Sequence, residues 1–453
     1  MAIKNHFEAP VKKNLSFWFL ITFIFALGSL LRISLAVVNE EANDDHILVA
    51  EIMTGQNRIP GGQDCRECHS PKLYHWTLAN LYHLLSIKNG PDKILLAQLI
   101  NAATGILTLV IVFIFICEKN VPDTVKLVTS ALIALNPRLI GINAQATNDS
   151  FVIFFSTAAL YFLFRHMSSP RKKYLILLTL SSILAGLSKG TGIFLFPLIV
   201  LVLGAKSAVA TPPSQTPKKS FLNVLIFMLL WLGLVPWVGQ YKEKKHLHYQ
   251  QRPGFTSVAE SFCTFRLMAL IKDPHITQGD QIIPRHRASL WTQLYGRTYL
   301  LQFNNWPATW MPRPGNAITK LARAIFILAL WPSGLFLLGI MKKIRDWIRL
   351  LFKGRWDEAF FVNNGIHGIC LVMALVFIMV NSYLFKDLGS MKIIYIFPYL
   401  LSFVYFFMEG YDFFVRKMTS HPFVLFMSDA IMSLLLSLFC IDIIYLIQQL
   451  AVA

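Results

Sequence analysis

Long apolar runs dominate the hydrophobic pattern of this chain. A helix needs roughly 17 to 25 apolar residues to cross the hydrocarbon core of a bilayer. Runs of this length recur along almost the whole sequence, near residues 15–38, 94–117, 125–143, 149–165, 174–189, 191–206, 221–239, 322–341, 366–384, 392–410 and 424–448. The pattern predicts an all-α polytopic membrane protein of about eleven transmembrane helices, built as one membrane-embedded domain over residues 1–453.

The composition agrees with a membrane protein. Of the 453 residues, 55% are hydrophobic and only 15% are charged, whereas soluble domains carry about 25% charged residues. The net charge of +18 would indicate a nucleic-acid partner in a soluble chain. In a membrane protein, Lys and Arg instead mark the cytoplasmic loops. We therefore expect membrane lipids, and no nucleic acid, as the surroundings of this chain.

The basic residues also predict a topology. Lys4, Lys12 and Lys13 precede the first apolar run, which is too long for a signal-peptide core and has no small-residue cleavage site after it. Alternate short loops carry "RHMSSPRKK", "TPPSQTPKK", "MKKIRDWIRLLFKGRW" and "VRKM". All of these fall on the same side as the N-terminus, so we expect that side to be cytoplasmic and the C-terminus to lie outside.

Two large loops, 39–93 and 240–321, face away from the cytoplasm in this topology. Eight of the twelve histidines lie in them, and seven acidic residues lie between Glu40 and Glu67. Titratable groups concentrated on one face indicate chemistry at that face. We expect two interfacial helices in loop 39–93, one over "HILVAEIM" and one over "SPKLYHWTLANLYHLL".

Asp44 and Asp45 stand at the start of the first of these helices. Acids at that place can simply stabilise the helix dipole, and on the local pattern this interpretation is as good as a catalytic one. Between the two helices lies a C-x-x-C-H motif, Cys65, Cys68 and His69. It is compatible with covalent haem, a disulfide, free thiols, or a metal such as Zn²⁺ held by Cys65, Cys68, His69 and His46. A short turn between interfacial helices offers no haem cavity, so haem is the weakest of these.

Several stretches together resemble the GT-C membrane glycosyltransferases, in particular their protein O-mannosyltransferase and aminoarabinose-transferase branch. An acid after the first span is followed by an interfacial helix and a Pro-containing helix, and further matching stretches occur in the same order along the chain: "ATNDSFVIFF", "LAGLSKGTGIFLFP", "SLWTQLYGRTYLLQFNNWP" and "KIIYIFPYL". The resemblance implies a GT-C fold. It also implies transfer of a sugar from a polyprenyl-phosphate donor to an extracytoplasmic acceptor (protein, lipid or polysaccharide), with inversion, in a bacterial inner membrane.

The resemblance assigns the catalytic acids. Asp45 matches the family position of the general base, and Asp44 is the alternative if the match slips by one residue. Asp149 matches a second loop acid that orients the acceptor, although "ND" before an apolar run is also an ordinary helix start. No cofactor is expected for the chemistry itself.

Substrate contacts are expected from residues at the other matching positions. Lys189, in "LSKG", is the first candidate cation for the leaving phosphate, with snorkelling to the interface as its alternative. The remaining candidates are His46, His69, Lys72, Tyr74, Lys392, Tyr395 and Arg297. The chain departs from the family in that Asp45 is followed by His46, His69 and Lys72 replace a Glu and a Pro, and Ile394 replaces an Arg.

Two other classes of function fit a multi-pass chain. A lipid-linked-sugar flippase or another transporter would show repeated halves or broken helices near mid-membrane, and the sequence shows neither pattern. A haem-bearing redox protein would use the C-x-x-C-H motif and would show a Soret band.

Overall fold

The computed structural model describes residues 15–42, 44–210, 258–272, 274, 277–278, 281–282, 289–301, 303, 310, 316–354, 365–385 and 391–452. The helices in these ranges are α1 (Leu15–Val38), α2 (His46–Gly55), α3 (Leu73–Leu84), α4 (Gly90–Cys117), α5 (Asp123–Ala134), α6 (Pro137–Asn143), α7 (Asp149–Ser168), α8 (Lys172–Ser188), α9 (Leu195–Ala210), α11 (Val258–Cys263), α12 (Leu267–Lys272), α14 (Leu290–Tyr299), α15 (Asn316–Leu328), α16 (Leu330–Phe352), α17 (Gly365–Phe385), α18 (Leu400–Lys417) and α19 (Pro422–Val452). The 3₁₀ turns are η1 (Arg66–His69), η2 (Gly190–Phe194), η6 (Ile393–Tyr395) and η7 (Phe397–Tyr399), and two short strands, β1 (Thr277–Gln278) and β2 (Gln281–Ile282), pair antiparallel.

The helical membrane fold is confirmed. Within the described ranges, six helical segments are long and apolar enough to cross a bilayer: α1, α4, α7, the α15–α16 segment, α17 and α19. The bent pair of α5 and α6 can form a seventh. α8 has 17 residues and, with α9, occupies two further predicted runs. The predicted run 221–239 lies outside the described residues, so the number eleven stays a prediction.

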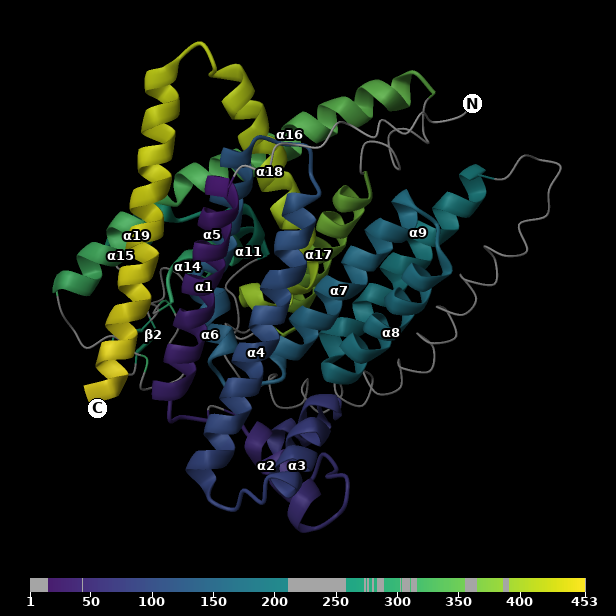
Figure 1. The fold of residues 1–453 in the computed structure, drawn as a ribbon, viewed down its shortest axis with the longest axis vertical. Coiled ribbons are helices and arrows are strands. Elements are labelled where there is room, and N and C mark those ends of the chain that lie inside the picture. Colours follow the sequence, from purple (N-terminus) through teal and green to yellow (C-terminus); the bar gives the residue numbers. More distant parts are fainter. Residues whose placement is uncertain are drawn as a thin grey trace.

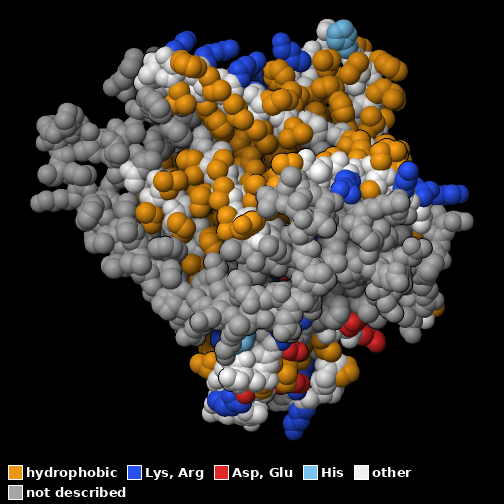
Figure 2. Space-filling model, turned by 180° about the vertical axis from the view of Figure 1, so that it is seen from behind, with side chains coloured by type: hydrophobic (Ala, Val, Ile, Leu, Met, Phe, Trp, Pro, Cys, Tyr) orange, Lys and Arg blue, Asp and Glu red, His pale blue; other side chains and the backbone are white. Residues whose placement is uncertain are grey.

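The arrangement of the helices gives the molecule two distinct ends (Figure 1). α1, α4 and α19 run along the long axis, α2 and α3 form a unit at one end, and α16 crosses the opposite end. Lys and Arg side chains gather at the α16 end, above a broad apolar surface (Figure 2). Exposed apolar side chains of α1, such as Phe19 and Leu30, belong to the lipid-facing surface of the bundle. We call the α2–α3 end the outer end and the α16 end the inner end.

A break between α5 and α6 bends this segment by 45°. Pro137 has no N–H to continue the helix, and the side chain of Asn136 caps the new helix by accepting from the Leu139 N–H at 3.0 Å. The end of α5 leaves carbonyls without helical partners. The buried guanidinium of Arg32 donates to one of them, Ala134 O, at 2.7 Å, and to Asn143 at 3.0 Å. Arg32 therefore fastens α1 to the break.

α16 and α18 cross with their backbones in contact. A Cβ on Gly339 would lie 1.9 Å from Phe406 O, and a Cβ on Gly410 would lie 1.8 Å from Leu335 O. Only glycine allows this approach. α18 itself begins later than the predicted run 392–410, because η6 and η7 precede it and Pro398 interrupts regular helix there. These turns bring Lys392 to the outer end of the bundle, near the α2–α3 unit.

Candidate active site

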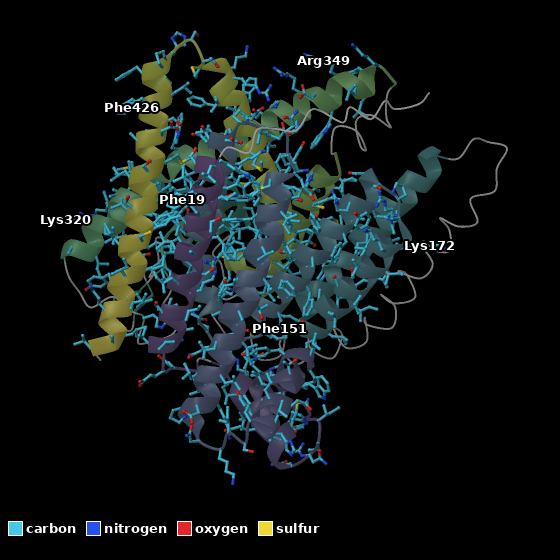
Figure 3. The ribbon with its side chains drawn as sticks, in the orientation of Figure 1. Phe19, Phe151, Lys172, Lys320, Arg349 and Phe426 are labelled. Atoms are coloured by element: carbon cyan, nitrogen blue, oxygen red, sulfur yellow. A yellow bond between two sulfur atoms is a disulfide. The ribbon has the colours of Figure 1, made fainter. Side chains whose placement is uncertain are left out.

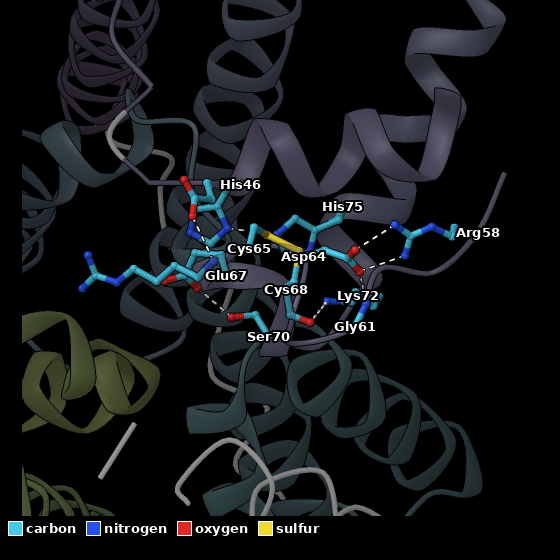
Figure 4. Close-up of a disulfide and its surroundings, with 12 residues drawn as sticks. His46, Arg58, Gly61, Asp64, Cys65, Glu67, Cys68, Ser70, Lys72 and His75 are labelled. Carbon is cyan, nitrogen blue, oxygen red and sulfur yellow. Dashed lines mark hydrogen bonds and ion pairs between the residues drawn. A yellow bond between two sulfur atoms is a disulfide. The ribbon is translucent and has the colours of Figure 1, made fainter. Parts of the chain in front are cut away.

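The outer unit consists of two helices, α2 and α3, at the places where the sequence predicted them, joined by a cross-linked turn. Cys65 and Cys68 form a disulfide, and Lys72 Nζ donates to Cys68 O at 2.6 Å (Figure 4). Of the alternatives for C-x-x-C-H, the disulfide is therefore correct. The metal site of Cys65, Cys68, His69 and His46 is wrong, because the two sulfurs bond to each other, and the described residues contain no group of three ligands able to hold a metal.

A histidine pair holds α2 against α3. His46 Nδ1 and His75 Nε2 are 2.9 Å apart and share one proton, and the two rings stack. His46 is 3% and His75 0% exposed. Burial lowers the pKa of both imidazoles below the usual value, because the charged form loses its hydration. His46, a predicted substrate contact, is thus a neutral buried group at neutral pH.

The two acids before α2 have different surroundings. Asp45 occupies the N-cap position of α2 without a side-chain capping bond, and its carboxylate accepts from the Arg66 N–H at 3.0 Å. Asp44 is half-buried. Burial and the nearby charge of Glu67 raise its pKa, while His46 and Lys392 oppose this shift. Asp44 and Lys392 on the bundle are therefore within electrostatic range of each other.

Asp149 and Lys189 meet at the outer ends of α7 and α8. The Lys189 ammonium forms an ion pair and a hydrogen bond with the Asp149 carboxylate. Thr147 Oγ1 donates to the other carboxylate oxygen at 3.3 Å. Asp149 is the first residue of α7, where an acid can stabilise the helix N-terminus. Its carboxylate instead pairs with Lys189. Lys189, for which snorkelling was the alternative, points into the protein and neutralises this acid.

Further cations lie beside these groups. The Lys392 ammonium is within electrostatic range of Arg297, Arg138, Asp44 and Asp149. Arg297 and Arg138 are buried, at 2% and 4% exposure. The Nε of Arg138 has no hydrogen-bond partner among the described residues. We call Asp44, Asp149, Lys189, Lys392, Arg138 and Arg297 the outer charged cluster.

Arg138 and Glu67 were missed by the sequence reasoning. Arg138 stands in the apolar stretch "NPRLIGIN", and a cation inside a predicted span is a functional candidate by default, so this signal was present. Glu67 gave no such signal, because its approach to Asp44 depends on the disulfide-linked turn.

The remaining predicted contacts lie around the cluster. Tyr74 is buried between the unit and the bundle, where its hydroxyl accepts from Asn101 at 3.3 Å and its ring packs on Phe151. Phe151 is labelled in Figure 3. Tyr395 lies in η6 and packs on Phe377. His69 belongs to η1, where its ring covers Gly62.

An apolar cavity of about 490 Å³ adjoins the cluster. Its walls come from α5, α6, α14, α16, α17, η6, η7, α18 and α19. Three of its lining residues, Leu139, Thr298 and Ile393, directly follow Arg138, Arg297 and Lys392 in the chain. The arrangement places an apolar chamber beside a set of cations and carboxylates.

Comparisons with known proteins agree with the resemblance seen in the sequence. The sequence model of the dolichyl-phosphate-mannose-protein mannosyltransferase family matches residues 78–250. No curated protein matches the chain in a sequence comparison. Among solved structures, the archaeal oligosaccharyltransferase AglB from Archaeoglobus fulgidus is 12% identical with a TM-score of 0.50, over 97% of this chain and 56% of the archaeal one.

Two other solved structures are similar over smaller parts. ArnT from Cupriavidus metallidurans is 14% identical over 86% of this chain and 77% of its own, with a TM-score of 0.39. The Pmt1–Pmt2 complex of S. cerevisiae is 18% identical over 53% of this chain, with a TM-score of 0.38. This chain spans 34% of that yeast chain. The chain has the helical membrane fold that its sequence resemblance predicted, similar to that of the archaeal oligosaccharyltransferase, and residues 78–250 match the mannosyltransferase family model.

Proposed function

We propose that this protein transfers a sugar from a polyprenyl-phosphate-linked donor to an acceptor outside the cytoplasm, with inversion at the anomeric carbon. The observation that carries the proposal is that three cations of the outer charged cluster, Arg138, Arg297 and Lys392, directly precede residues that line the apolar cavity. A polyprenyl-phosphate sugar has a long apolar tail, a phosphate and a polar sugar in this order. The cavity, the cations and the carboxylates present matching surroundings in the same order.

The cations fit a leaving phosphate. Sugar transfer breaks the bond between the anomeric carbon and the phosphate oxygen, and the freed polyprenyl phosphate gains negative charge. Preorganised cations stabilise such charge where it develops. Lys392, Arg297 and Arg138 supply three positive charges next to the cavity, and Arg138 Nε is a donor without a partner among the described residues. We propose that these side chains do the work of a metal ion, so that turnover is insensitive to a chelator.

The carboxylates fit a general base. The base takes the proton of the acceptor hydroxyl as its oxygen attacks the anomeric carbon from the face opposite the phosphate, and the proton later passes to water. The family resemblance favours Asp45. The surroundings of Asp44 make it the alternative, because burial and the nearby Glu67 raise its pKa and thereby strengthen it as a proton acceptor. We propose Asp44 as the base, with Asp45 positioning the turn through Arg66 N–H and Asp149 holding Lys189 in place.

The distribution of charge supports one orientation of the protein in the membrane. Lys and Arg gather at the inner end (Figure 2), and such residues remain on the cytoplasmic side. We propose that the N-terminus is cytoplasmic, that the outer charged cluster faces the other compartment, and that the membrane is a bacterial inner membrane. A disulfide in the outer unit suits an oxidising compartment.

The test uses purified protein in nanodiscs with a panel of radiolabelled polyprenyl-phosphate sugars, and follows release of free polyprenyl phosphate. Wild type should turn over at least one donor. Asp44→Asn should reduce that turnover by roughly 10²- to 10⁴-fold, the usual contribution of a general base. Asp123→Asn, an exposed acid at the start of α5, is the matched control and should leave turnover unchanged.

The outcomes separate the alternatives. A greater loss in Asp45→Asn than in Asp44→Asn would transfer the base to Asp45 without changing the reaction. Tight donor binding with transport across the bilayer, and no release of polyprenyl phosphate in the presence of acceptor extracts, would favour a flippase. Folded protein that neither binds nor cleaves any donor would remove the glycosyltransferase proposal.

A further inference from the structure

The disulfide of the outer unit encloses two residues, Arg66 and Glu67, and each of them acts on one of the acids before α2. The Arg66 N–H donates to the Asp45 carboxylate at 3.0 Å. The charge of Glu67 lies within electrostatic range of Asp44. We call residues 65–68 the bridged turn. Its shape decides which groups face both candidate bases.

The bridge also packs directly on α2, the helix that follows these acids. Cys68 forms a small buried cluster with Val49 and Ile52 of α2, and Cys65 packs against this cluster. The bridged turn therefore meets the start of α2 through an apolar contact, a hydrogen bond and a charge.

The two cysteines of the bridge differ in exposure. Cys68 is 3% exposed, whereas Cys65 is half-buried and stands between two exposed residues, Asp64 and Arg66. Exchange between a thiol and a disulfide requires that one sulfur attack another along an open path. Cys65 is thus the cysteine that a reagent in solution reaches first.

Two further contacts of the bridged turn come from the chain that follows it (Figure 4). Ser70 Oγ donates to the Glu67 carboxylate at 2.8 Å, and Lys72 Nζ donates to Cys68 O at 2.6 Å. Both contacts stay within one short stretch of chain, whereas the contact with Asp45 crosses to α2. A cross-link restricts mainly the segment that it closes, so opening this one loosens the turn and leaves the helical bundle folded.

We propose that Cys65 and Cys68 form a thiol–disulfide exchange site that switches the candidate active site. The closed bridge holds Arg66 and Glu67 against the acids, and the reduced chain is the inactive state. The co-reactant is a disulfide oxidant for closure and a dithiol for opening. This inference rests on the proposed function, because the switch acts on the acids of that site.

Closure is a balanced two-electron exchange. The Cys65 thiolate attacks the oxidant disulfide, and one oxidant sulfur leaves as a thiolate that takes up a proton. The Cys68 thiolate then attacks Cys65 Sγ in the mixed disulfide, which forms the bridge and releases the second oxidant sulfur as a thiol. Two electrons and two protons pass from the cysteines to the oxidant. Opening by a dithiol is the reverse of this sequence.

The experiment treats purified protein in nanodiscs with dithiothreitol and then with glutathione disulfide. Mass spectrometry follows alkylation of Cys65 and Cys68, and amide hydrogen exchange follows residues 44–55 and 65–72. Release of polyprenyl phosphate from a donor gives the turnover. Reduction should open the bridge, with Cys65 alkylated before Cys68, and should speed exchange in both segments but not in α7. Turnover should fall by up to about 100-fold, as for a misplaced catalytic group, and should return on reoxidation.

Two variants separate the bridge from other effects of the reagents. The double change Cys65→Ser and Cys68→Ser should give the low turnover with and without dithiothreitol. Cys263→Ser removes an exposed free cysteine and should respond to both reagents as wild type does.

Three results would overturn the switch. They are a bridge that dithiothreitol does not open in folded protein, an opened bridge without faster exchange in either segment, and equal turnover of the open and closed forms. If no form cleaves any donor, the glycosyltransferase proposal fails, and hydrogen exchange alone then decides whether the bridge controls the turn and the start of α2.

Discussion

At the scale of single residues, the outer unit depends on buried polar side chains that satisfy one another. His46 with His75, Asp149 with Lys189, and Tyr74 with Asn101 each join two segments that are distant in sequence. A buried polar group without its partner costs about 1–3 kcal/mol, so each pair specifies one arrangement of the unit on the bundle. The position of Asp44 beside Lys392 follows from these contacts.

The histidine pair predicts a pH dependence of stability. Burial lowers the pKa of both imidazoles below the ordinary value of 6.5, so below this pH the unfolded chain binds more protons than the folded one. The contribution of the pair is complete above about pH 6.5 and is lost as the pH falls toward the folded-state pKa values. Thermal unfolding measured between about pH 8 and pH 5 should show this loss.

Two variants test whether the histidine pair causes this pH dependence of stability. The double change His46→Leu and His75→Leu removes both titrating groups and should flatten the pH dependence in that range. His83→Gln, which changes an exposed histidine of α3, should keep the wild-type dependence. An unchanged slope in the double variant would mean that other groups cause it.

The sequence predicted which side chains belong to the site better than it predicted the role of each one. Asp44, Asp149, Lys189, Lys392 and Arg297 were expected at a site, and the structure brings them together. Which acid faces the cations depends on the entry angle of α2, and that angle is fixed by the histidine pair and the disulfide-linked turn. Spacing in the sequence carries no information on such long-range contacts.

At the scale of elements, interruptions of helices position the site. Pro137 ends α5 and starts α6, which carries Arg138, and the turns η6 and η7 before α18 carry Lys392. In both places a proline stops regular helix near the outer end. The length of the apolar runs predicted that these spans exist. It gave α5 and α6 as one run and started α18 too early, because hydropathy alone cannot show where a helix breaks between two apolar segments.

The crossing of α16 and α18 gives a prediction at this scale. Gly410→Ala places a Cβ 1.8 Å from Leu335 O, so the helices must separate, and overpacking of this kind typically costs about 1–3 kcal/mol. Thermal unfolding should show a lower midpoint for this variant. The control Gly334→Ala, on the partner helix α16, meets nothing within 4 Å and should be neutral or slightly stabilising. Equal midpoints in the two variants would contradict the tight crossing.

At the scale of the whole molecule, charge and apolar surface are segregated along the long axis. Basic side chains lie at the inner end and the α2–α3 unit at the outer end (Figure 2). The sequence predicted that the basic loops gather on one side, because loop composition alone is enough for this, and the orientation in the membrane stays a prediction. It could not predict the cavity, whose walls combine residues from Thr129 to Phe439.

Labelling of single cysteines tests the orientation. In a background without the four free cysteines, Lys88→Cys lies after α3 at the outer end, and Ser168→Cys lies at the opposite end of α7 from Asp149. An impermeant maleimide should label Lys88→Cys on intact cells and Ser168→Cys only after permeabilisation. Labelling of both from the same side, or in the reverse order, would contradict the topology.

The Cys65–Cys68 bridge also has a consequence for preparing the protein. Thiol reductants are routine additives in membrane-protein buffers, and they open bridges that are accessible. Without its cross-link, the turn that holds Glu67, and that receives Lys72 at Cys68 O, relies on hydrogen bonds alone. Expression in a system that oxidises the bridge, and purification without reductant, will keep one batch of the protein comparable with the next.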